Sequence, residues 1–159
     1  MLSLGTPCAA VTKGPGYAGG GVTAGDGFWG VQVVGERRYP PWFGLYGEGG
    51  LFALTGGGSV YWGLGLGLRA AIPGRVSPYV GLGGHFGLVY GHAEFRTGEQ
   101  PQSRIDLVFE GLSAYPEMGL QTRLTKGLLL NTAARYYSEP DRAGAGFWAA
   151  QVGLQWQVD

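Results

Sequence analysis

A two-residue alternation that sets glycine against large apolar side chains is the feature that most constrains this chain. In VYWGLGLGLRAA, residues 60–71, apolar side chains occupy even positions while Gly63, Gly65 and Gly67 occupy odd ones. A helix would scatter these glycines around its circumference and lose about 1 kcal/mol for each, whereas a strand places every large apolar group on one face. The segment therefore predicts a β-strand.

The same alternation predicts strands on both sides of this segment. It is strongest in PYVGLGGHFGLVYGH and close to the C-terminal end. An odd number of strands would leave an unpaired edge in a closed sheet, so an eighth strand is expected within the glycine-rich residues 8–24. The other strands are expected at 28–37, 42–54, 59–72, 78–95, 115–124, 127–138 and 146–158.

Short connections indicate how these strands are joined. Joints that contain proline or glycine at 37–41, 72–75 and 125–127 are typical of antiparallel hairpins. We therefore predict an all-β fold, an antiparallel up-and-down β-barrel of eight strands in a single domain. Residues 1–27 are expected to form an N-terminal segment with a weak first strand, and residues 28–159 the remainder of the barrel.

The two strand faces differ in composition, and this difference indicates which face meets water. A soluble barrel would carry charge opposite its apolar face, but here the opposite face is dominated by glycine, which suits a narrow lumen. The apolar face is therefore expected outside, against membrane lipid, so that the barrel is transmembrane; a soluble glycine-rich β-protein is the alternative. The expected lipid-facing side chains are Leu64, Leu66, Leu68, Leu82, Leu88, Val152 and Leu154. Aromatic girdles at the membrane interfaces are expected from Trp42, Trp62, Tyr79, Tyr90, Trp148 and Trp156.

Charge and cysteine content argue against several other functions. Lys and Arg together number 11, as do Asp and Glu, so the chain lacks the positive charge of an electrostatic nucleic-acid binder. One cysteine, Cys8, and 2 histidines cannot form an internal disulfide or a Cys/His zinc site. We expect no nucleic-acid partner, no metal and no cofactor.

The last predicted strand carries the most specific motif. The segment QVGLQWQV, residues 151–158, resembles the C-terminal assembly signal of the small outer-membrane β-barrels of the OmpA/OmpX/OmpW-like superfamily, polar-x-Gly-x-x-aromatic-x-aromatic. Gln151, Gly153 and Trp156 match this signal, whereas Val158 stands where the family has an aromatic residue and Asp159 follows it. The strand pattern on which the resemblance rests extends over residues 28–158. It implies location in a bacterial outer membrane and handling by the outer-membrane insertion machinery.

Charged residues on the inward-facing positions predict a polar network inside the barrel. Burying an unpaired charge costs several kcal/mol, so charges of both signs in a narrow lumen are expected to pair and to plug it. The alternative is a polar path that makes the barrel a narrow, porin-like channel for small or hydrophobic solutes. The expected network consists of Glu48, Arg69, His85, Glu117, Arg123 and Arg135.

Some barrels of this superfamily are lipid-modifying enzymes, which is a further alternative. The resemblance implies that an enzyme of the lipid A deacylase type would carry a His-x-Ser-Asn motif on one strand. In this chain neither His85 nor His92 is followed by that sequence. Ser113 and Glu110 offer only a loose grouping with His92. We therefore expect no catalytic residues.

The longest connection, residues 96–114, has an apolar centre at 105–109 that exceeds what a solvated loop requires. It is expected either to extend its hairpin beyond the membrane or to contact a second copy or an extracellular partner. The sequence thus predicts an outer-membrane barrel that acts as a structural or interaction protein without catalysis. Its extramembrane loops are the expected surface for self-assembly.

Overall fold

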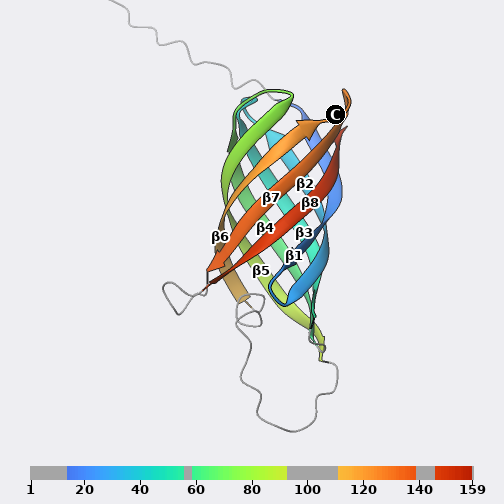
Figure 1. The fold of residues 1–159 in the computed structure, drawn as a ribbon, viewed down its shortest axis with the longest axis vertical. Helices are drawn as coiled ribbons and strands as arrows, with labels where there is room; N and C mark the ends of the chain where they lie inside the picture. Colours follow the sequence, from blue (N-terminus) through green and yellow to red (C-terminus); the bar gives the residue numbers. More distant parts are fainter. Residues whose placement is uncertain (1–13, 56–58, 93–110, 139–145, 159) are drawn as a thin grey trace, which may run out of the picture.

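The computed structural model describes residues 14–55, 59–92, 111–138 and 146–158, and it arranges them as a closed β-barrel (Figure 1). Each strand pairs antiparallel with the next one in the chain, and β8 pairs with β1, so the barrel has no free edge. The predicted all-β, up-and-down barrel of eight strands is confirmed. The strands are β1 (Gly16–Gly25), β2 (Phe28–Arg38), β3 (Phe43–Leu54), β4 (Ser59–Ala71), β5 (Val76–His92), β6 (Gly111–Arg123), β7 (Leu128–Ser138) and β8 (Gly146–Val158).

No helix in the described ranges is long and apolar enough to cross a membrane.

The strand β6 begins earlier than its sequence pattern indicates, at Gly111 instead of residue 115. Pro116, which has no N–H to donate to a neighbouring strand, lies inside this strand. The pairing of β6 with β7 runs over Glu117–Arg123 and stops immediately before this proline. On the other side of Pro116, the hydroxyl of Ser138 donates to the carbonyl of Ala114 at 3.2 Å. The proline therefore lies within the strand, where it interrupts one ladder without ending the strand.

The barrel has two different ends. At one of them, the terminal end, the chain enters β1, β8 finishes, and short turns at 39–42, 72–75 and 124–127 join successive strands. The opposite end, the loop end, holds the Asp26-Gly27 turn and the connections that join β3 to β4, β5 to β6 and β7 to β8. Gly27 has a φ of 81°, a conformation that favours glycine and closes the tight β1–β2 hairpin.

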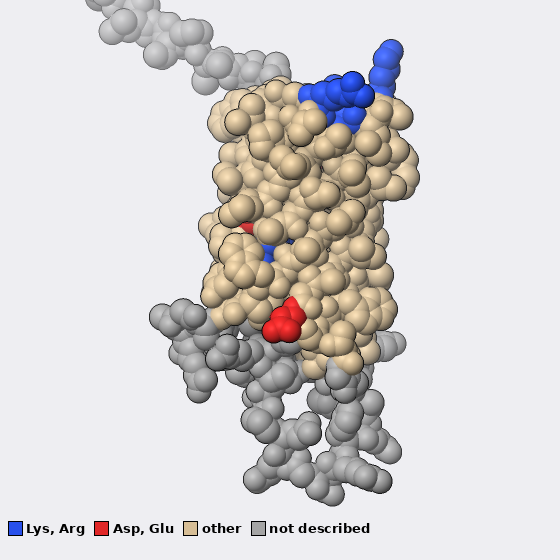
Figure 2. Space-filling model, viewed as in Figure 1, with Lys and Arg blue, Asp and Glu red and all other residues tan. Residues whose placement is uncertain are grey.

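Side chains alternate between a buried lumen and an exposed outer surface, as the sequence pattern predicts. The side chains expected to face lipid are all exposed on the outer surface, from 38% for Leu154 to 71% for Leu66. Figure 2 shows this surface as largely uncharged on the face in view. A continuous apolar band of this kind suits contact with lipid and does not suit the surface of a soluble protein.

Tryptophans on the outer face, of which Trp62 is half-buried, lie close to both ends of this apolar band. Trp42 precedes β3 and Trp156 lies near the end of β8, so both are at the terminal end. Trp62 and Trp148 lie towards the loop end, where Trp29, which the sequence analysis did not assign to a girdle, is 53% exposed. Their positions agree with aromatic girdles at two membrane interfaces.

The assignment of Tyr79 to a girdle is wrong, because this side chain is buried in the lumen. Tyr79 has the same parity as Gly81 and His85 on β5, and the ring lies 4.8 Å from the guanidinium of Arg69. The alternation along β5 therefore already indicated an inward position. The expectation for Tyr90 concerns a side chain that lies outside the described part of the chain.

Candidate functional site in the barrel lumen

The lumen holds a group of polar and charged side chains that the strand alternation turns inward. They come from strands on opposite sides of the barrel, and each whole residue is at most 8% exposed. We call this group the lumen network: Glu36 and Arg38 from β2, Glu48 from β3, Arg69 from β4, Glu117 and Gln121 from β6, and Arg135 from β7.

Glu117 lies between two arginines at the centre of the lumen network. The Nε of Arg69 donates to Oε1 of Glu117 at 2.5 Å, and the Nε of Arg135 donates to Oε2 at 3.0 Å. Arg135 also holds Glu48 through two parallel hydrogen bonds, Nη1 to Oε1 at 2.6 Å and Nη2 to Oε2 at 2.8 Å. Bidentate, charge-assisted bonds of this kind are both strong and geometrically specific. They connect β3, β4, β6 and β7 across the lumen.

Glu36 is the second centre of the lumen network, nearer the terminal end. It accepts hydrogen bonds from Nη1 of Arg69 at 2.8 Å and from Nε of Arg38 at 3.1 Å. The amide nitrogen of Gln121 donates to the same carboxylate at 2.9 Å, and Arg38 in turn donates to the amide oxygen of Gln121. Arg69 thus links the two carboxylates, Glu36 and Glu117, into one continuous set of ion pairs.

The charges of the lumen network balance, with three carboxylates and three guanidiniums. Five of these six side chains are at most 4% exposed, and Arg38 is 10% exposed. Charges buried to this degree are tolerated only when partners compensate their lost hydration. The network is therefore a structural unit in which removal of one member leaves another without its partner.

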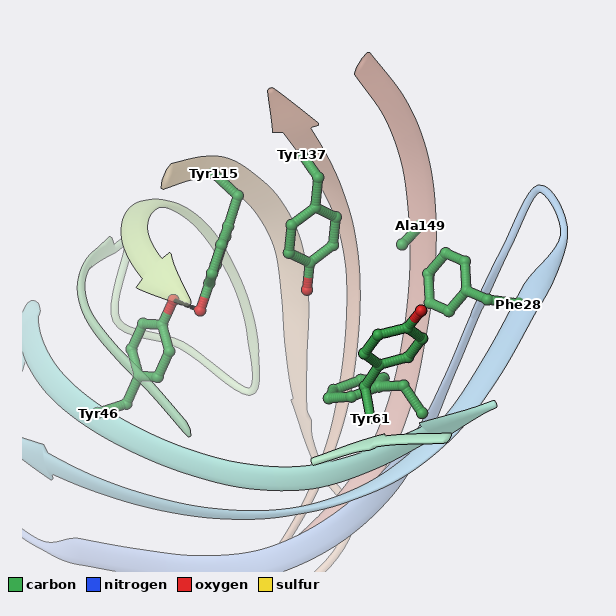
Figure 3. Packing of buried hydrophobic residues seen from close by; sticks show 7 residues of the cluster. Phe28, Tyr46, Tyr61, Tyr115, Tyr137 and Ala149 are labelled. Carbon is green, nitrogen blue, oxygen red and sulfur yellow. Dashed lines mark hydrogen bonds between the residues drawn. The ribbon is translucent and has the colours of Figure 1, made fainter. Parts of the chain in front are cut away.

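Tyrosines pack against the charged groups and extend the hydrogen bonding. The hydroxyl of Tyr46 donates to that of Tyr115 at 3.1 Å (Figure 3). Tyr115 in turn donates to Glu48 at 2.9 Å. The guanidinium of Arg69 lies 4.0 Å from the ring centre of Tyr46, and that of Arg135 lies 4.6 Å from that of Tyr115. Such stacking stabilises the arginines in a poorly hydrated site.

Aromatic side chains fill the lumen nearer the loop end. The ring of Phe147 lies 5.4 Å from that of Phe28, edge to face, and 5.4 Å from that of Tyr137, stacked. Figure 3 shows Phe28 and Tyr61 beside Ala149 on β8, with Tyr137 on the neighbouring strand. We call this group the loop-end aromatic cluster: Phe28, Phe52, Tyr61, Tyr137 and Phe147.

The structure places most of the predicted lumen residues together and excludes one. Glu48, Arg69, Glu117 and Arg135 are joined by ion pairs, and His85 is buried on the same wall. Arg123 is exposed, so its assignment to the network is corrected. Its parity agrees with the lumen, but it is the last residue of β6, where the barrel opens to solvent.

Sequence reasoning missed Glu36 and Arg38 as members of the network. Both have the same parity on β2 as Gln32 and Val34, which face the lumen. The two-residue alternation was therefore a sufficient signal for finding them.

His85 is the histidine whose surroundings the structure describes. It is paired across the sheet with Ser113 of β6, and the two residues are 1% and 4% exposed. Its ring lies 5.4 Å from that of Phe52 and 6.3 Å from that of Tyr137, both edge to face. The imidazole is therefore enclosed by aromatic rings. The looser grouping around His92 and Glu110 falls on side chains outside the described residues.

No group of three or more His, Cys, Asp or Glu side chains that could hold a metal ion occurs among the described residues.

The C-terminal motif divides between the two faces of β8. Gln151 is buried in the lumen, whereas Trp156 and Val158 are 53% and 44% exposed on the outer surface. This strand also closes the barrel, with Gly153 paired to Gly21 of β1. The motif residues that a membrane or an assembly factor would meet are therefore the outward-facing Trp156 and Val158.

No protein-family model and no curated protein sequence matches the chain. Solved structures do match it. The N-terminal β-barrel domain of Pseudomonas aeruginosa OprF aligns with a TM-score of 0.66 and 12% sequence identity, over 92% of this chain and 100% of that chain. The chain has the fold of the eight-stranded outer-membrane β-barrels.

Other barrels of this kind align over nearly the same length. OprG from P. aeruginosa has a TM-score of 0.57 at 14% identity, over 91% of this chain and 96% of that chain. Ail from Yersinia pestis, in a phospholipid bilayer nanodisc, has a TM-score of 0.57 at 15% identity, over 91% and 99%. The predicted resemblance to OmpA/OmpX-like barrels is confirmed for the fold, which is what identities of 12–15% establish.

Proposed function

We propose that this chain is a plugged barrel of a bacterial outer membrane that acts as a structural or interaction protein without catalysis. The observation that carries the proposal is the lumen network, in which three carboxylates and three guanidiniums occupy the interior. Eight-stranded barrels have interiors that side chains can fill, and here charged and aromatic groups do so in succession. A barrel of this kind acts through its stable wall and its loops, and it provides no path for solutes across the membrane.

Conductance in planar lipid bilayers tests the plugged lumen. We expect no steady single-channel steps from the refolded protein, while a large porin in the same bilayers serves as the positive control. Steady steps would contradict the plug. If steps occur, comparing Glu117→Ala with Arg123→Ala shows whether they pass through the lumen, because Glu117 lies in the network and Arg123 at the open rim.

A narrow polar path is the second candidate, and unpartnered amides in one part of the lumen wall favour it. Gln32 of β2 and Gln151 and Gln155 of β8 are at most 5% exposed. Their side-chain oxygens have no hydrogen-bond partner among the described residues. Buried amides normally bind water in that situation. Osmotic swelling of proteoliposomes separates the candidates: a plugged barrel swells at the rate of empty liposomes, and a continuous hydrated path swells faster.

The absence of catalysis is supported by the surroundings of His85 and Ser113. Both side chains are buried, and aromatic rings enclose the imidazole, so a lipid substrate has no direct approach to them. We expect the purified barrel to leave lipopolysaccharide and phospholipid unchanged in mass. Release of fatty acid that is lost in the Ser113→Ala variant would identify the protein as a lipid-modifying enzyme.

Self-association through the extramembrane segment 96–114 is the proposed interaction. The structure describes only residues 111–114 of it, which belong to β6, so part of the segment extends the hairpin. The apolar residues 105–109 are the expected contact with a second copy. Sedimentation in detergent is expected to show a dimer or larger species that becomes monomeric when residues 99–109 are deleted. A monomeric full-length protein would contradict this interaction.

A further inference from the structure

Positive charge gathers at the terminal end of the barrel, where the residues that the structure describes include no exposed acid. Exposed Arg75, Arg123 and Lys126 and half-buried Arg37 lie on strand ends and turns at this end. The described acids are the three glutamates of the lumen network and Asp26, which lies at the opposite end. Figure 2 shows the basic side chains clustered at the terminal end and acidic ones lower on the molecule. The described part of this end therefore carries four uncompensated positive charges.

Three of these cations surround one pocket, which we call the rim pocket. Its volume is ≈ 420 Å³, and another depression on the surface has a similar volume of ≈ 380 Å³. Its basic side chains are Arg37 from β2, Arg123 from β6 and Lys126 from the β6–β7 turn. Its remaining lining consists of Gly14, Pro15, Gly16, Tyr17, Gln157 and Val158.

Arg37 has donor capacity left within the rim pocket. Its guanidinium lies over Gly16, where an added Cβ would be 3.3 Å from Nη1. Its Nε is buried and has no hydrogen-bond partner among the described residues. Three cations around one pocket, one of which has an unused N–H group, suit an anion with several acceptor oxygens, such as a phosphate.

The rim pocket also adjoins the apolar outer surface. Val158 lines the pocket and is 44% exposed, and Trp156 lies on the same face of β8. Next to them on β1, Ala18 is paired with Trp156 and Gly20 with Leu154, which leaves a strip of small side chains beside large ones. A molecule with a phosphate in the pocket can therefore rest acyl chains against this strip. Tryptophan at this depth is typical of the membrane interface.

We propose that the rim pocket binds the phosphate of an anionic phospholipid in the membrane leaflet at the terminal end. Charge complementarity favours this ligand, because each Lys or Arg near an anionic membrane surface contributes about 1 kcal/mol, or about a fivefold preference. The inference rests on the proposed membrane location of the barrel. It adds a specific lipid contact that a plugged structural barrel does not require.

Electron paramagnetic resonance of spin-labelled lipids tests the rim pocket in the refolded full chain. The protein is placed in phosphatidylcholine vesicles that contain spin-labelled phosphatidylglycerol or spin-labelled phosphatidylcholine, and the fraction of motionally restricted label is measured. We expect phosphatidylglycerol to be preferred about fivefold or more at low salt. The variant Arg37→Gln/Arg123→Gln/Lys126→Gln is expected to prefer it less than twofold.

Arg75→Gln is the matched control, because Arg75 is an exposed cation at the same end that does not line the rim pocket. Retained selectivity in this variant supports a localised site. Equal losses from Arg75→Gln and from each single pocket variant would overturn the pocket in favour of diffuse attraction. Binding of inorganic phosphate to a pocket that shows no preference for phosphatidylglycerol would assign the pocket to a soluble anion and overturn the lipid assignment.

Folding is measured in the same samples by the shift in electrophoretic mobility on heating, so the two proposals can fail separately. A folded, inserted protein without lipid selectivity overturns the rim-pocket proposal alone. A protein that does not insert into either kind of vesicle overturns the membrane location, and the rim-pocket proposal with it.

Discussion

Replacing Glu117 by alanine is the perturbation that most directly tests whether the lumen network holds the barrel together. The change removes the hydrogen bonds that Glu117 accepts from Arg69 and Arg135, and it turns a neutral set of six charges into one with an excess positive charge. Removing one partner of a buried ion pair costs about 3–5 kcal/mol. In this variant Arg69 still has its ion pair with Glu36, and Arg135 still has its ion pair with Glu48. We therefore expect the free energy of unfolding to fall by about 3 kcal/mol, the lower end of that range.

The free energy of unfolding is measured by urea titration of the protein in phospholipid vesicles, followed by tryptophan fluorescence and by heat-dependent mobility. Arg123→Ala is the matched control, because it removes an exposed arginine from the neighbouring part of β6 and should change stability by less than about 0.5 kcal/mol. Glu117→Ala combined with Arg69→Met restores charge balance. This double variant is expected to lose less stability than the two single losses added together.

A loss of unfolding free energy below about 0.5 kcal/mol in Glu117→Ala would refute the reasoning, since leaving a buried charge without its partner destabilises a protein by more than that. Such a result would mean that water solvates the arginines and that the lumen is open. Strict additivity in the double variant would show that Arg69 and Glu117 do not depend on each other, in spite of their contact.

Four further predictions follow from the closed barrel and its two faces. The folded protein should resist SDS at room temperature and change mobility after boiling, because a closed barrel has no free edge; identical mobility would count against closure. Leu66, 71% exposed midway along β4, should tolerate Phe but lose about 2–4 kcal/mol with Arg in vesicle unfolding titrations, and equal effects would place it away from lipid. Gly65→Leu should destabilise the barrel in the same titrations, because a Cβ there would lie 2.8 Å from Cγ of Glu48. Gly35→Leu is the control, because a Cβ at Gly35 meets open space and should change the stability little; equal losses of stability would contradict the filled lumen. Val158→Phe, which completes the C-terminal motif on an exposed position, should speed insertion by purified outer-membrane assembly machinery, and an unchanged rate would separate this chain from that signal.

Local periodicity was enough to predict the strands and the faces of the barrel, because the alternation within each strand shows which of its sides is apolar. Leu66 and Gly65 illustrate this, since their opposite orientations follow from one alternation within β4. The errors occurred where the alternation loses its meaning. Arg123 stands at a strand end, where an inward position opens to solvent, and Tyr79 was assigned by residue type although its parity on β5 indicated the lumen.

The partners within the lumen could not be predicted, because they depend on how the barrel closes. Arg135 and Glu48 form a bidentate pair although 87 positions separate them in the chain. Their strands, β7 and β3, are not neighbours in the sheet, so no hairpin register brings them together. A sequence pattern shows that both side chains face inward, and only the diameter and stagger of the closed barrel decide that they meet.

The inward-facing glycines explain how so narrow a lumen holds so many large side chains. In register, Gly65 is paired with Glu48 and Gly67 with Tyr46 across the β3–β4 ladder, and Gly81 is paired with Glu117 across the β5–β6 ladder. An added Cβ would lie 2.8 Å from Oε1 of Glu48 at Gly65 and 2.7 Å from Oε1 of Glu117 at Gly81. Each large side chain therefore lies over the glycine of the next strand, in space that any other residue would occupy.

This pairing changes what the glycine content implies about the lumen. Glycine opposite glycine would leave an empty interior, but glycine opposite a charged or aromatic residue supplies the room that residue needs to lie across the barrel. The carboxylates of Glu48 and Glu117 can reach Arg135 together only because Gly65 and Gly81 leave their approach clear. At Gly65, Gly67 and Gly81 the small residue of one strand thus makes room for the large residue paired with it on the neighbouring strand, so these glycines and the plug belong to one arrangement.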